Sequence, residues 1–440
     1  MQYTIKLTSE VALYLSRVAF ACFVAVCLST SLKAEPLSKL LPDFLANHNQ
    51  VKAAKSDVAA AKETAVAAKG GWYPSLSSTF TYGNEQQQKP TGDDTNMVSR
   101  QATLTITQRL WDGGETSSAI RTANLSQQQS EAILKTTKSS LLLRGFTAYM
   151  NVIRAAEGLR YAKRSEANIK KQTELEDALV KRGAGFSTDV LQAKVQFSGA
   201  QARRVRAEGG LALATNAYRG VFLQEPGPID EMIKPILPTD LIPASVEEAV
   251  ASALKNNSFL ISNSLTSQIA MEAVNSTRAR EYMPTVDGIV DFNHKRDVGS
   301  TWGTQQEIFS KVQVSFPFNL GFTAINTLKA TSEVQNAANY RYADAKTSIE
   351  EATRNAWEQL KTAKLNALML KNQANIASEF LVFARKERTL GRRSLLDVLG
   401  GETALINSSS DSASANIDIA IATIALLDAM GELTEGALSR

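Results

Sequence analysis

Few side chains in this sequence could carry out nucleophilic or metal chemistry. The chain has two histidines, His48 and His294, and two cysteines, Cys22 and Cys27. Zinc sites and catalytic triads need several such groups close together, often at short spacings such as H-x-x-x-H. The sequence contains no such spacing. We therefore expect no enzyme activity, no catalytic residue, no cofactor and no metal site, and we predict that both histidines are isolated and solvated.

The glycine-rich segment GAGFST, residues 183–188, has some likeness to a phosphate-binding loop. Such a loop follows a strand and supplies a lysine to the phosphates. Here the segment follows a helical pattern and contains no lysine, so the sequence argues against nucleotide binding. The formal net charge of +4 on 440 residues is close to balance. It gives no reason to expect a nucleic-acid partner.

Residues 1–34 have the organisation of a cleavable signal peptide. Lys6 and Arg17 precede an apolar run over residues 18–28, and small residues lead to Ala34. This run is well short of the roughly 20 apolar residues that span a bilayer, although an uncleaved anchor helix is the alternative. Both cysteines lie in this segment, so the exported chain would contain no disulfide and no thiolate site.

The rest of the chain repeats one plan twice. RGAGFSTDVL begins at residue 182 and aligns with LGRRSLLDVL, which begins at residue 390. In this alignment Gly183 meets Gly391 and Asp189 meets Asp397. Between the copies, residues 223–244 contain five prolines. Because proline fixes its own backbone and restricts the preceding residue, this segment is predicted to be an irregular connector.

Each copy is predicted to contain a helix, a strand hairpin, a very long helix, a tight turn and a returning helix. The first repeat, 35–222, contains helix 43–70, strand hairpin 75–109, long helix 113–182 and helix 188–222. The second repeat, 245–440, contains helix 245–280, strand hairpin 285–317, long helix 321–390 and helix 395–430. The fold class is therefore mainly α with a small β part. A seam of small residues in the first helix predicts close packing against another helix: Val51, Ala54, Val58, Ala61, Ala65 and Ala68.

The two long helices are predicted to be longer than a compact globular core is wide. Asp112 is predicted to cap the first of them, with Glu115 completing a capping box. Helical periodicity then continues to about Arg182, which corresponds to roughly 100 Å at 1.5 Å per residue. A helix of this length must pack sideways against other helices or project from the molecule.

The four predicted strands each place apolar residues on one parity and many polar residues on the other. The apolar sets are Leu76, Phe80 and Tyr82; Ala102, Leu104 and Ile106; Val286, Val290 and Phe292; and Ile308, Val312, Val314 and Phe316. Such alternation over about ten residues fits a barrel wall with one face to lipid and one to water. Trp72, Tyr73, Trp302 and Phe318 fall near strand ends, where interfacial aromatics would lie. A soluble hairpin with one buried face is the alternative for any single strand.

Two hairpins cannot close a barrel within one chain, because the outer strands would keep unpaired edges. If the strands enter a membrane, the pattern therefore predicts an oligomer whose copies close the barrel together.

The step LWDGG from strand to helix, the G…DVL turn between helices, the tandem repeat and the signal peptide together resemble the TolC family of outer-membrane efflux and type I secretion channels. The resemblance covers essentially the whole chain after residue 34. It implies a homotrimer with four strands per protomer in one 12-stranded outer-membrane barrel, surrounded by outer-membrane lipid. The helices would form a hollow cylinder across the periplasm, with connector 223–244 at its equator.

The resemblance also implies partners. The helical tips would dock onto a periplasmic adaptor (membrane fusion) protein joined to an inner-membrane transporter of the ABC or RND type. The channel would conduct proteins or small molecules passively, since the transporter supplies the energy. A periplasmic coiled-coil scaffold or tether without a pore is the alternative, although it leaves the four matching strands unexplained.

The family motif places candidate functional residues at the two tips. Asp397 matches a carboxylate that rings the periplasmic entrance, and Arg393 matches a basic position that holds the entrance closed. Arg388 replaces a tip tyrosine common in the family, and Gly400 stands where a second acid is frequent. The adaptor-docking residues would be Gly183, Gly185, Ser187, Asp189, Gly391, Arg392, Ser394 and Leu395.

Simpler structural readings exist for several of these residues. Ser394 and Asp397 have the spacing of a helix capping box, and Asp189 suits the first turn of a helix. The tip arginines fit a solvated basic turn as well as an adaptor contact. Gly183, Gly185 and Gly391 suit turns with a left-handed or tight backbone.

Overall fold

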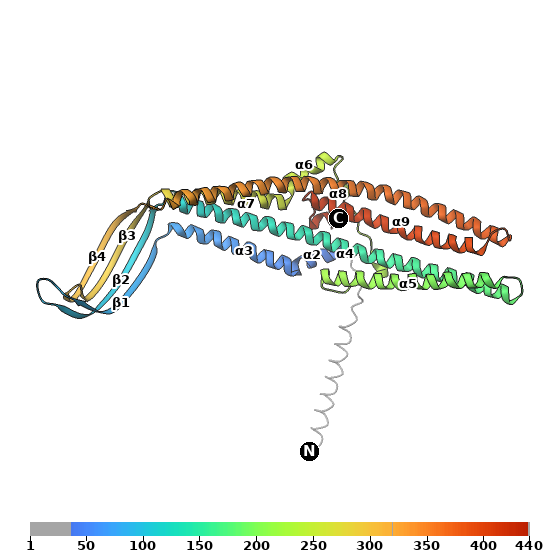
Figure 1. Ribbon diagram of the computed structural model, residues 1–440, viewed down its shortest axis with the longest axis horizontal. Helices are drawn as coiled ribbons and strands as arrows, with labels where there is room; N and C mark the ends of the chain where they lie inside the picture. Colours follow the sequence, from blue (N-terminus) through green and yellow to red (C-terminus); the bar gives the residue numbers. More distant parts are fainter. Residues whose placement is uncertain (1–36, 319, 439–440) are drawn as a thin grey trace, which may run out of the picture.

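The computed structural model describes residues 37–318 and 320–438 and is a long, narrow molecule with a sheet at one end and helical hairpins at the other (Figure 1). The expected signal peptide, residues 1–34, lies outside the described residues. The helices are α2 (Leu37–Asn47), α3 (Asn49–Lys69), α4 (Glu115–Lys181), α5 (Ser187–Phe222), α6 (Val246–Asn256), α7 (Ser258–Tyr282), α8 (Thr323–Thr389), α9 (Leu395–Ala429) and α10 (Glu435–Leu438). The strands are β1 (Ser75–Gln87), β2 (Thr95–Trp111), β3 (Thr285–Val298) and β4 (Thr301–Ser315).

The first helix of each repeat is broken in two, which the sequence analysis missed. His48 separates α2 from α3, and its Nδ1 accepts a hydrogen bond from the Gln50 N–H at 3.2 Å. Asn257 separates α6 from α7, and its Oδ1 accepts from the Phe259 and Leu260 N–H groups at 3.0 and 3.3 Å. Each side chain accepts hydrogen bonds from backbone N–H groups that have no partner within the helix. These hydrogen bonds stabilise the break between the two helices.

His48 is therefore not the solvated residue that we expected. It is 8 % exposed and its ring packs edge-on against Phe44 with centroids 5.5 Å apart. Burial, together with the nearby positive charge of Arg144, lowers the pKa of His48. The imidazole serves as a neutral helix cap. His294 lies within β3, opposite Ala102 of β2 and Gln306 of β4.

The helices form one layer that is continuous along the molecule. In the half nearer the sheet, α4 packs against α3 and α7, and α7 packs against α8. In the other half, α4 packs against α5 and α9, and α9 packs against α8. The two long helices, α4 and α8, run the whole length, while α3 and α5, and likewise α7 and α9, succeed each other along the layer (Figure 1). The predicted seam of α3 is buried or half-buried throughout, whereas most of its other residues are exposed.

The largest core lies at mid-length, where α2, α4, α5 and α9 meet the connector. Tyr149, Tyr218 and Phe146 are almost completely buried there, and Phe222 lies between the rings of Phe44 and Tyr218. The Tyr149 hydroxyl donates to the Ile233 carbonyl at 2.9 Å and so fixes the connector to α4. Burial raises the pKa of Tyr149, and the hydrogen bond only partly opposes this shift. The phenol therefore remains a donor at neutral pH.

Helix α9 is the single described helix that is long and apolar enough to span a bilayer. Its apolar residues instead pack in the protein interior, since Ile417, Ile424 and Leu427 belong to the mid-length core. Asp418 and Asp428 interrupt its apolar run and are paired with Arg154 and Ser139 of α4. The helix is a core element of the layer.

The sheet is antiparallel, in the order β1-β2-β3-β4. Its register places the even-numbered residues on one face and the odd-numbered residues on the other. Leu104 lies opposite Phe292, and Phe292 opposite Ile308, so the even-numbered apolar residues share one face. The odd-numbered face carries polar links between strands. Thr103 donates to Asn293 at 2.8 Å, Thr105 donates to Asp291 at 2.7 Å, and Lys295 pairs with Glu307 at 2.7 Å.

Sheet and helices meet at a sharp turn, and here the expected capping box is wrong. The residue that caps α4 is Gly114, with φ of 98°, and the helix begins at Glu115. The carboxylate of Asp112, which is 1 % exposed, accepts from the Gly114 and Thr116 N–H groups at 2.9 and 2.7 Å. Asp112 therefore binds the helix start from two residues before the cap, because Gly113 and Gly114 both adopt positive φ. Burial opposes ionisation of Asp112, but the hydrogen bonds from Thr116 and Gly114 outweigh it and lower its pKa.

Replacement of this carboxylate should destabilise the junction in a pH-dependent way. We expect Asp112→Ala to cost about 1 kcal/mol at neutral pH, because two N–H groups at a helix start lose their acceptor. A carboxylate with a lowered folded pKa contributes stability above its unfolded pKa of about 3.9 and loses it as pH falls through the lower folded value. Melting followed by circular dichroism at several pH values measures the difference. Glu115→Ala is the matched control, and an equal loss in both variants would contradict the assignment.

Candidate functional site at the helical tips

The two helical hairpins end in turns of the same design. Gly183, between α4 and α5, has φ of 73°, and Gly391, between α8 and α9, has φ of 71°. In each turn the glycine N–H donates to a carbonyl three residues earlier, Val180 or Arg388, at 2.9 Å. A left-handed residue of this kind ends a helix at low cost only when it lacks a Cβ atom. The two tips therefore lie at equivalent positions of the repeat.

Gly185 has a different constraint from the other two glycines. A Cβ atom at this position would lie 3.1 to 3.3 Å from Val180 and Leu179 of α4. Ser187 follows as the first residue of α5 and is exposed. The side chain of Phe186 beside it is 76 % exposed. The tip thus presents a large apolar side chain to its surroundings, a feature that the sequence analysis did not single out.

The second tip starts α9 with a capping serine. Ser394 is the N-cap residue, and its hydroxyl accepts from the Asp397 N–H at 3.2 Å. Leu395 is buried in the cluster that joins α9 to α4 and α5, whereas Arg392 is exposed. Asp397 is exposed as well, and its carboxylate makes no hydrogen bond or ion pair with the residues that the structure describes. The carboxylate is therefore free to face a solute.

The two tips are joined by Arg388. Its guanidinium lies 3.0 Å from the carboxylate of Glu176 on α4 and 4.0 Å from that of Asp189 on α5, and it also donates to the Arg393 carbonyl at 3.3 Å. The side chain of Glu176 is only 3 % exposed. A buried carboxylate needs such a partner, since an unpaired charge away from water is costly. Arg388 thus ties α8 to the neighbouring hairpin.

A second buried carboxylate lies farther along the same seam. Glu402 of α9 is 1 % exposed, pairs with Arg385 of α8 and accepts from Asn168 of α4 at 3.2 Å. Its burial rules out a place on an entrance ring and makes it a link between three helices. Arg393 pairs with Glu387 at 2.6 Å and lies 5.3 Å from the centre of the Phe380 ring.

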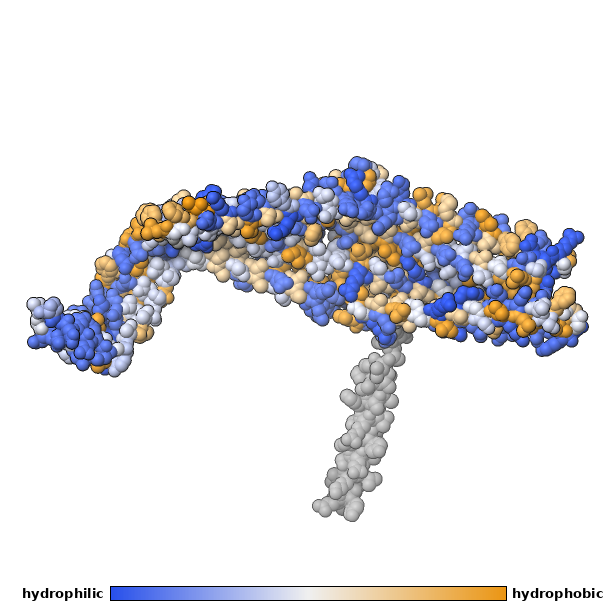
Figure 2. Space-filling model, viewed as in Figure 1, coloured by the Kyte–Doolittle hydropathy of each residue, from blue (hydrophilic) through white to orange (hydrophobic). Residues whose placement is uncertain are grey.

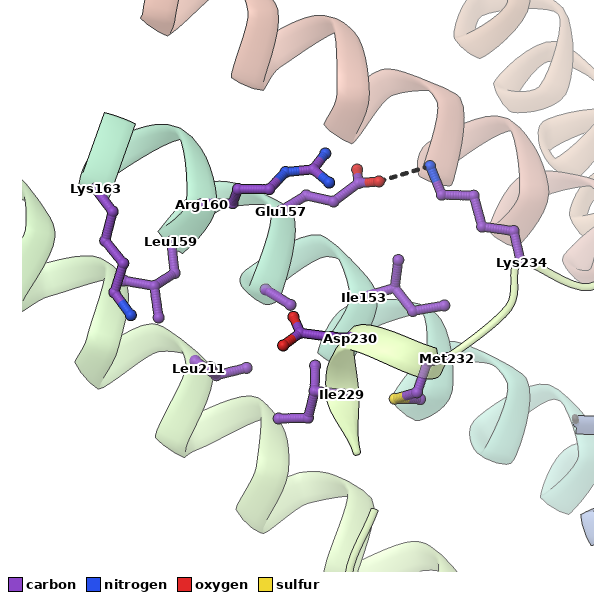
Figure 3. A pocket seen from close by; sticks show the side chains of 11 residues that line it. Ile153, Glu157, Leu159, Arg160, Lys163, Leu211, Ile229, Asp230, Met232 and Lys234 are labelled. Carbon is purple, nitrogen blue, oxygen red and sulfur yellow. Dashed lines mark ion pairs between the residues drawn. The ribbon is translucent and has the colours of Figure 1, made fainter. Parts of the chain in front are cut away.

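A cavity of about 450 Å³ lies at mid-length, beneath the connector (Figure 3). Its ionisable side chains have both signs, and Lys234 pairs with Glu157 at 2.9 Å. Apolar residues such as Leu211 and Met232 complete the lining. The lining contains no histidine, cysteine or serine, and no group of three or more potential metal ligands occurs among the described residues. The arrangement offers space and ionisable groups of both signs.

Removal of Arg388 should loosen both tips together. In Arg388→Ala the Glu176 carboxylate would remain buried without its partner, a situation that costs about 3–5 kcal/mol. We expect faster amide hydrogen exchange at the ends of α4 and α8, measured by mass spectrometry. Addition of Glu176→Gln should restore part of the protection, because it removes the uncompensated charge. Arg392→Ala is the control, and equal effects of the two arginine variants would argue against the tie.

Comparisons with known proteins agree with this architecture. Residues 40–220 match the family described as "Outer membrane efflux protein". The chain is 24 % identical to the outer membrane protein TolC of Vibrio cholerae, covering 93 % of each sequence. It is also 24 % identical to the alkaline protease secretion protein AprF of Pseudomonas aeruginosa, over 90 % of this chain and 84 % of AprF. The solved structure of the outer-membrane channel OprN has the same fold, with a TM-score of 0.79, 18 % identity, and 90 % and 89 % of the two chains covered. Over nearly its whole length the chain is therefore similar to TolC-like outer membrane efflux proteins, the family that its sequence resembles.

Proposed function

We propose that this chain is the protomer of a passive export duct in the outer membrane, with a large periplasmic portion. The observation that carries the proposal is the two-faced sheet joined to helices of 67 residues, α4 and α8. The strands have 13 to 17 residues, enough to cross a bilayer when tilted. The helices would reach roughly 100 Å beyond the sheet. A periplasmic scaffold has no use for a sheet with one apolar and one hydrogen-bonded polar face.

Aromatic and apolar residues surround the point where the sheet meets the helices, as the apolar patch in Figure 2 shows. Phe316, Phe318, Leu320 and Phe322 are between 58 % and 95 % exposed there. Large apolar side chains in water are unfavourable, whereas aromatic residues are enriched at the membrane interface. This belt therefore supports a membrane boundary at the strand–helix junction.

Three copies fit the sheet best. β1 and β4 each have one edge without a partner among the described residues. Such edges are not tolerated in lipid, so copies must close the sheet into a barrel. Two copies would give eight strands, whose interior side chains fill, whereas three give twelve and leave a wider interior. The polar odd-numbered face would then line the lumen.

The helical layer has matching edges. Large exposed apolar residues follow α8, among them Leu365, Leu368 and Ile376, which are 57 % to 59 % exposed. The opposite edge carries Val195, Val205 and Leu213 of α5, which are 57 % to 72 % exposed. A contact between the α8 edge of one copy and the α5 edge of the next is heterologous and generates a closed ring. The helical layers and the sheets of neighbouring copies would thus join in the same order around one axis.

The tips would form the periplasmic entrance and dock onto an adaptor protein that is joined to an inner-membrane transporter of the ABC or RND type. The docking surface would comprise the exposed tip residues Gly183, Ser187, Gly391 and Arg392, together with Gly185, Asp189, Ser394 and Leu395, which shape the turns. The ties of Arg388 and Arg393 would keep the resting entrance narrow. Adaptor binding would separate the tips, and cargo would pass through water without chemical change. The relatives named for efflux and for protease secretion make small molecules and proteins equally suitable cargo classes.

The assembly state is the first test of the duct. We expect the protein extracted from outer membranes in mild detergent to have the mass of three protomers, because three copies close the sheet. Native mass spectrometry measures this directly, and planar-bilayer recordings of the same particle should show ion conductance. A monomer in the membrane fraction would leave open strand edges in lipid and would contradict the duct. Release of the protein in soluble form would favour the scaffold.

Asp397 is the proposed acid of the entrance. Three copies would place three exposed carboxylates around the opening, where a multivalent cation could bind between them. We expect Asp397→Ala to weaken block by hexaamminecobalt(III) added from the periplasmic side by about tenfold or more. The substitution removes all three carboxylates, and a tenfold change corresponds to only about 1.4 kcal/mol. Current measured against blocker concentration tests this. Asp411→Ala, farther along α9, is the control, and unchanged block in Asp397→Ala would remove this residue from the entrance.

A further inference from the structure

The turn between β3 and β4 does not continue the plane of the sheet. The pairing of β3 with β2 ends at Arg296 opposite Arg100. Beyond it, Val298 pairs with Thr301, and the chain reverses direction at Gly299 and Ser300. Asp297, Gly299, Ser300 and Gly303 all have positive φ, between 55° and 102°. The Asp297 carboxylate accepts from the Gly303 N–H at 2.7 Å and stabilises the reversal. The backbone conformation is therefore defined by the turn itself.

This turn is fastened to the other hairpin. The Gly299 N–H donates to both oxygens of Glu85 on β1, at 3.2 and 3.1 Å. Thr95 of β2 donates to the Ser300 hydroxyl at 3.1 Å, and that hydroxyl donates to Gln87 of β1. To reach β1, the turn has to cross β2, because β3 is paired only with β2 and β4.

The crossing takes place over the polar face. Glu85, Gln87 and Thr95 have the odd parity of the hydrogen-bonded face. Met97, also of odd parity, is only 3 % exposed, whereas its even-numbered neighbour Val98 is 44 % exposed. The odd-numbered residues at this end of β1, β2 and β3 are in general more sheltered than the even-numbered ones. The turn therefore lies on the side that faces the interior when copies close the barrel.

We propose that the β3–β4 turn is a latch that narrows the outer mouth of the duct, held inward by its bonds to Glu85, Gln87 and Thr95. The inference rests on the proposed function, since only a closed barrel turns the odd-numbered face into a lumen. Three inward turns, one from each protomer, restrict the exit to small solutes. Large cargo passes when the turns swing outward, which requires the bifurcated hydrogen bond from Gly299 to Glu85 to break. The hydrophilic surface at this end of the sheet allows such a movement in water (Figure 2).

The carboxylate is the strongest part of the latch. It accepts one bifurcated hydrogen bond from the Gly299 N–H and another hydrogen bond from the Gln87 amide at 2.6 Å. Hydrogen bonds to ionised groups are stronger than those between neutral groups. It lies at the end of a strand, away from the apolar band of the sheet, so its removal leaves the barrel wall intact. A change in the latch can therefore be separated from a failure to fold.

Access from outside the cell tests the latch independently of the periplasmic tips. Thr79 has odd parity, lies nearer the helices than Glu85, and is exposed. In Thr79→Cys the new thiol would be the only one outside residues 1–34. Intact cells are treated with a small charged maleimide, or with a polyethylene-glycol maleimide of several kilodaltons, and labelling of the purified protein is measured over time. The unsubstituted chain is the blank.

We expect the small reagent to label Thr79→Cys readily and the large one slowly. Addition of Glu85→Ala should accelerate the large reagent by about tenfold or more, because hydrogen bonds to an ionised group favour the closed position by at least that factor. Glu85→Gln should have a smaller effect, since the amide oxygen still accepts from Gly299. Asp94→Ala removes a charge from the neighbouring loop and should change nothing.

Two other results overturn the inference at different levels. If the large reagent reacts equally fast with and without Glu85→Ala, the latch is wrong while the duct stands. If even the small reagent fails to label Thr79→Cys in the assembled protein, the odd-numbered face does not line a lumen. That outcome contradicts the duct on which the latch depends.

Discussion

The unpaired edges of β1 and β4 are the constraint on which the rest of the structure depends. Backbone N–H and C=O groups cannot remain without partners in lipid, and the four strands that the structure describes do not satisfy their own edges. The membrane-facing part therefore has no stable form as a single copy. A contact that joins different edges of neighbouring copies is heterologous and gives a ring where its rotation closes, and paired strand edges in lipid require such closure.

The helical layer, like the sheet, has two edges that need a partner. The exposed apolar residues of α8 and α5 lie on opposite edges of one layer, so the surfaces that a single copy leaves unfavourably solvated are those that a ring would bury. The broken first helices, α2–α3 and α6–α7, let short helices follow one another beside α4 and α8. The mid-length core around Tyr149 and Phe146 is then the largest cluster of buried apolar residues in the protomer.

The two ends of the molecule are held in place by different kinds of polar contact. At the tips, buried carboxylates pair with arginines across helices, and these contacts are stable only while both partners stay in place. At the outer end of the sheet, Glu85 holds a backbone N–H in a solvated setting, where a hydrogen bond is easier to exchange for water. The contacts at the tips are thus buried ion pairs, whereas the contact at the outer end of the sheet is a solvated hydrogen bond.

The sequence by itself determined the elements and their faces, because these depend on local periodicity. The period of two in the strands, the period near 3.6 in α4 and α8, and the tandem repeat at Gly183 and Gly391 are all readable from residue order. The resemblance of LWDGG and the DVL turns to one family supplied the architecture. Local patterns gave wrong predictions at helix starts: Asp112 binds α4 from outside the cap, and His48 caps a break instead of being solvated.

The partners of Arg388, the burial of Glu176 and Glu402, and the path of the β3–β4 turn to Glu85 depend on the tertiary structure alone. These contacts join residues from different elements, in most cases far apart in sequence. Their stability comes from burial and geometry that no local spacing encodes.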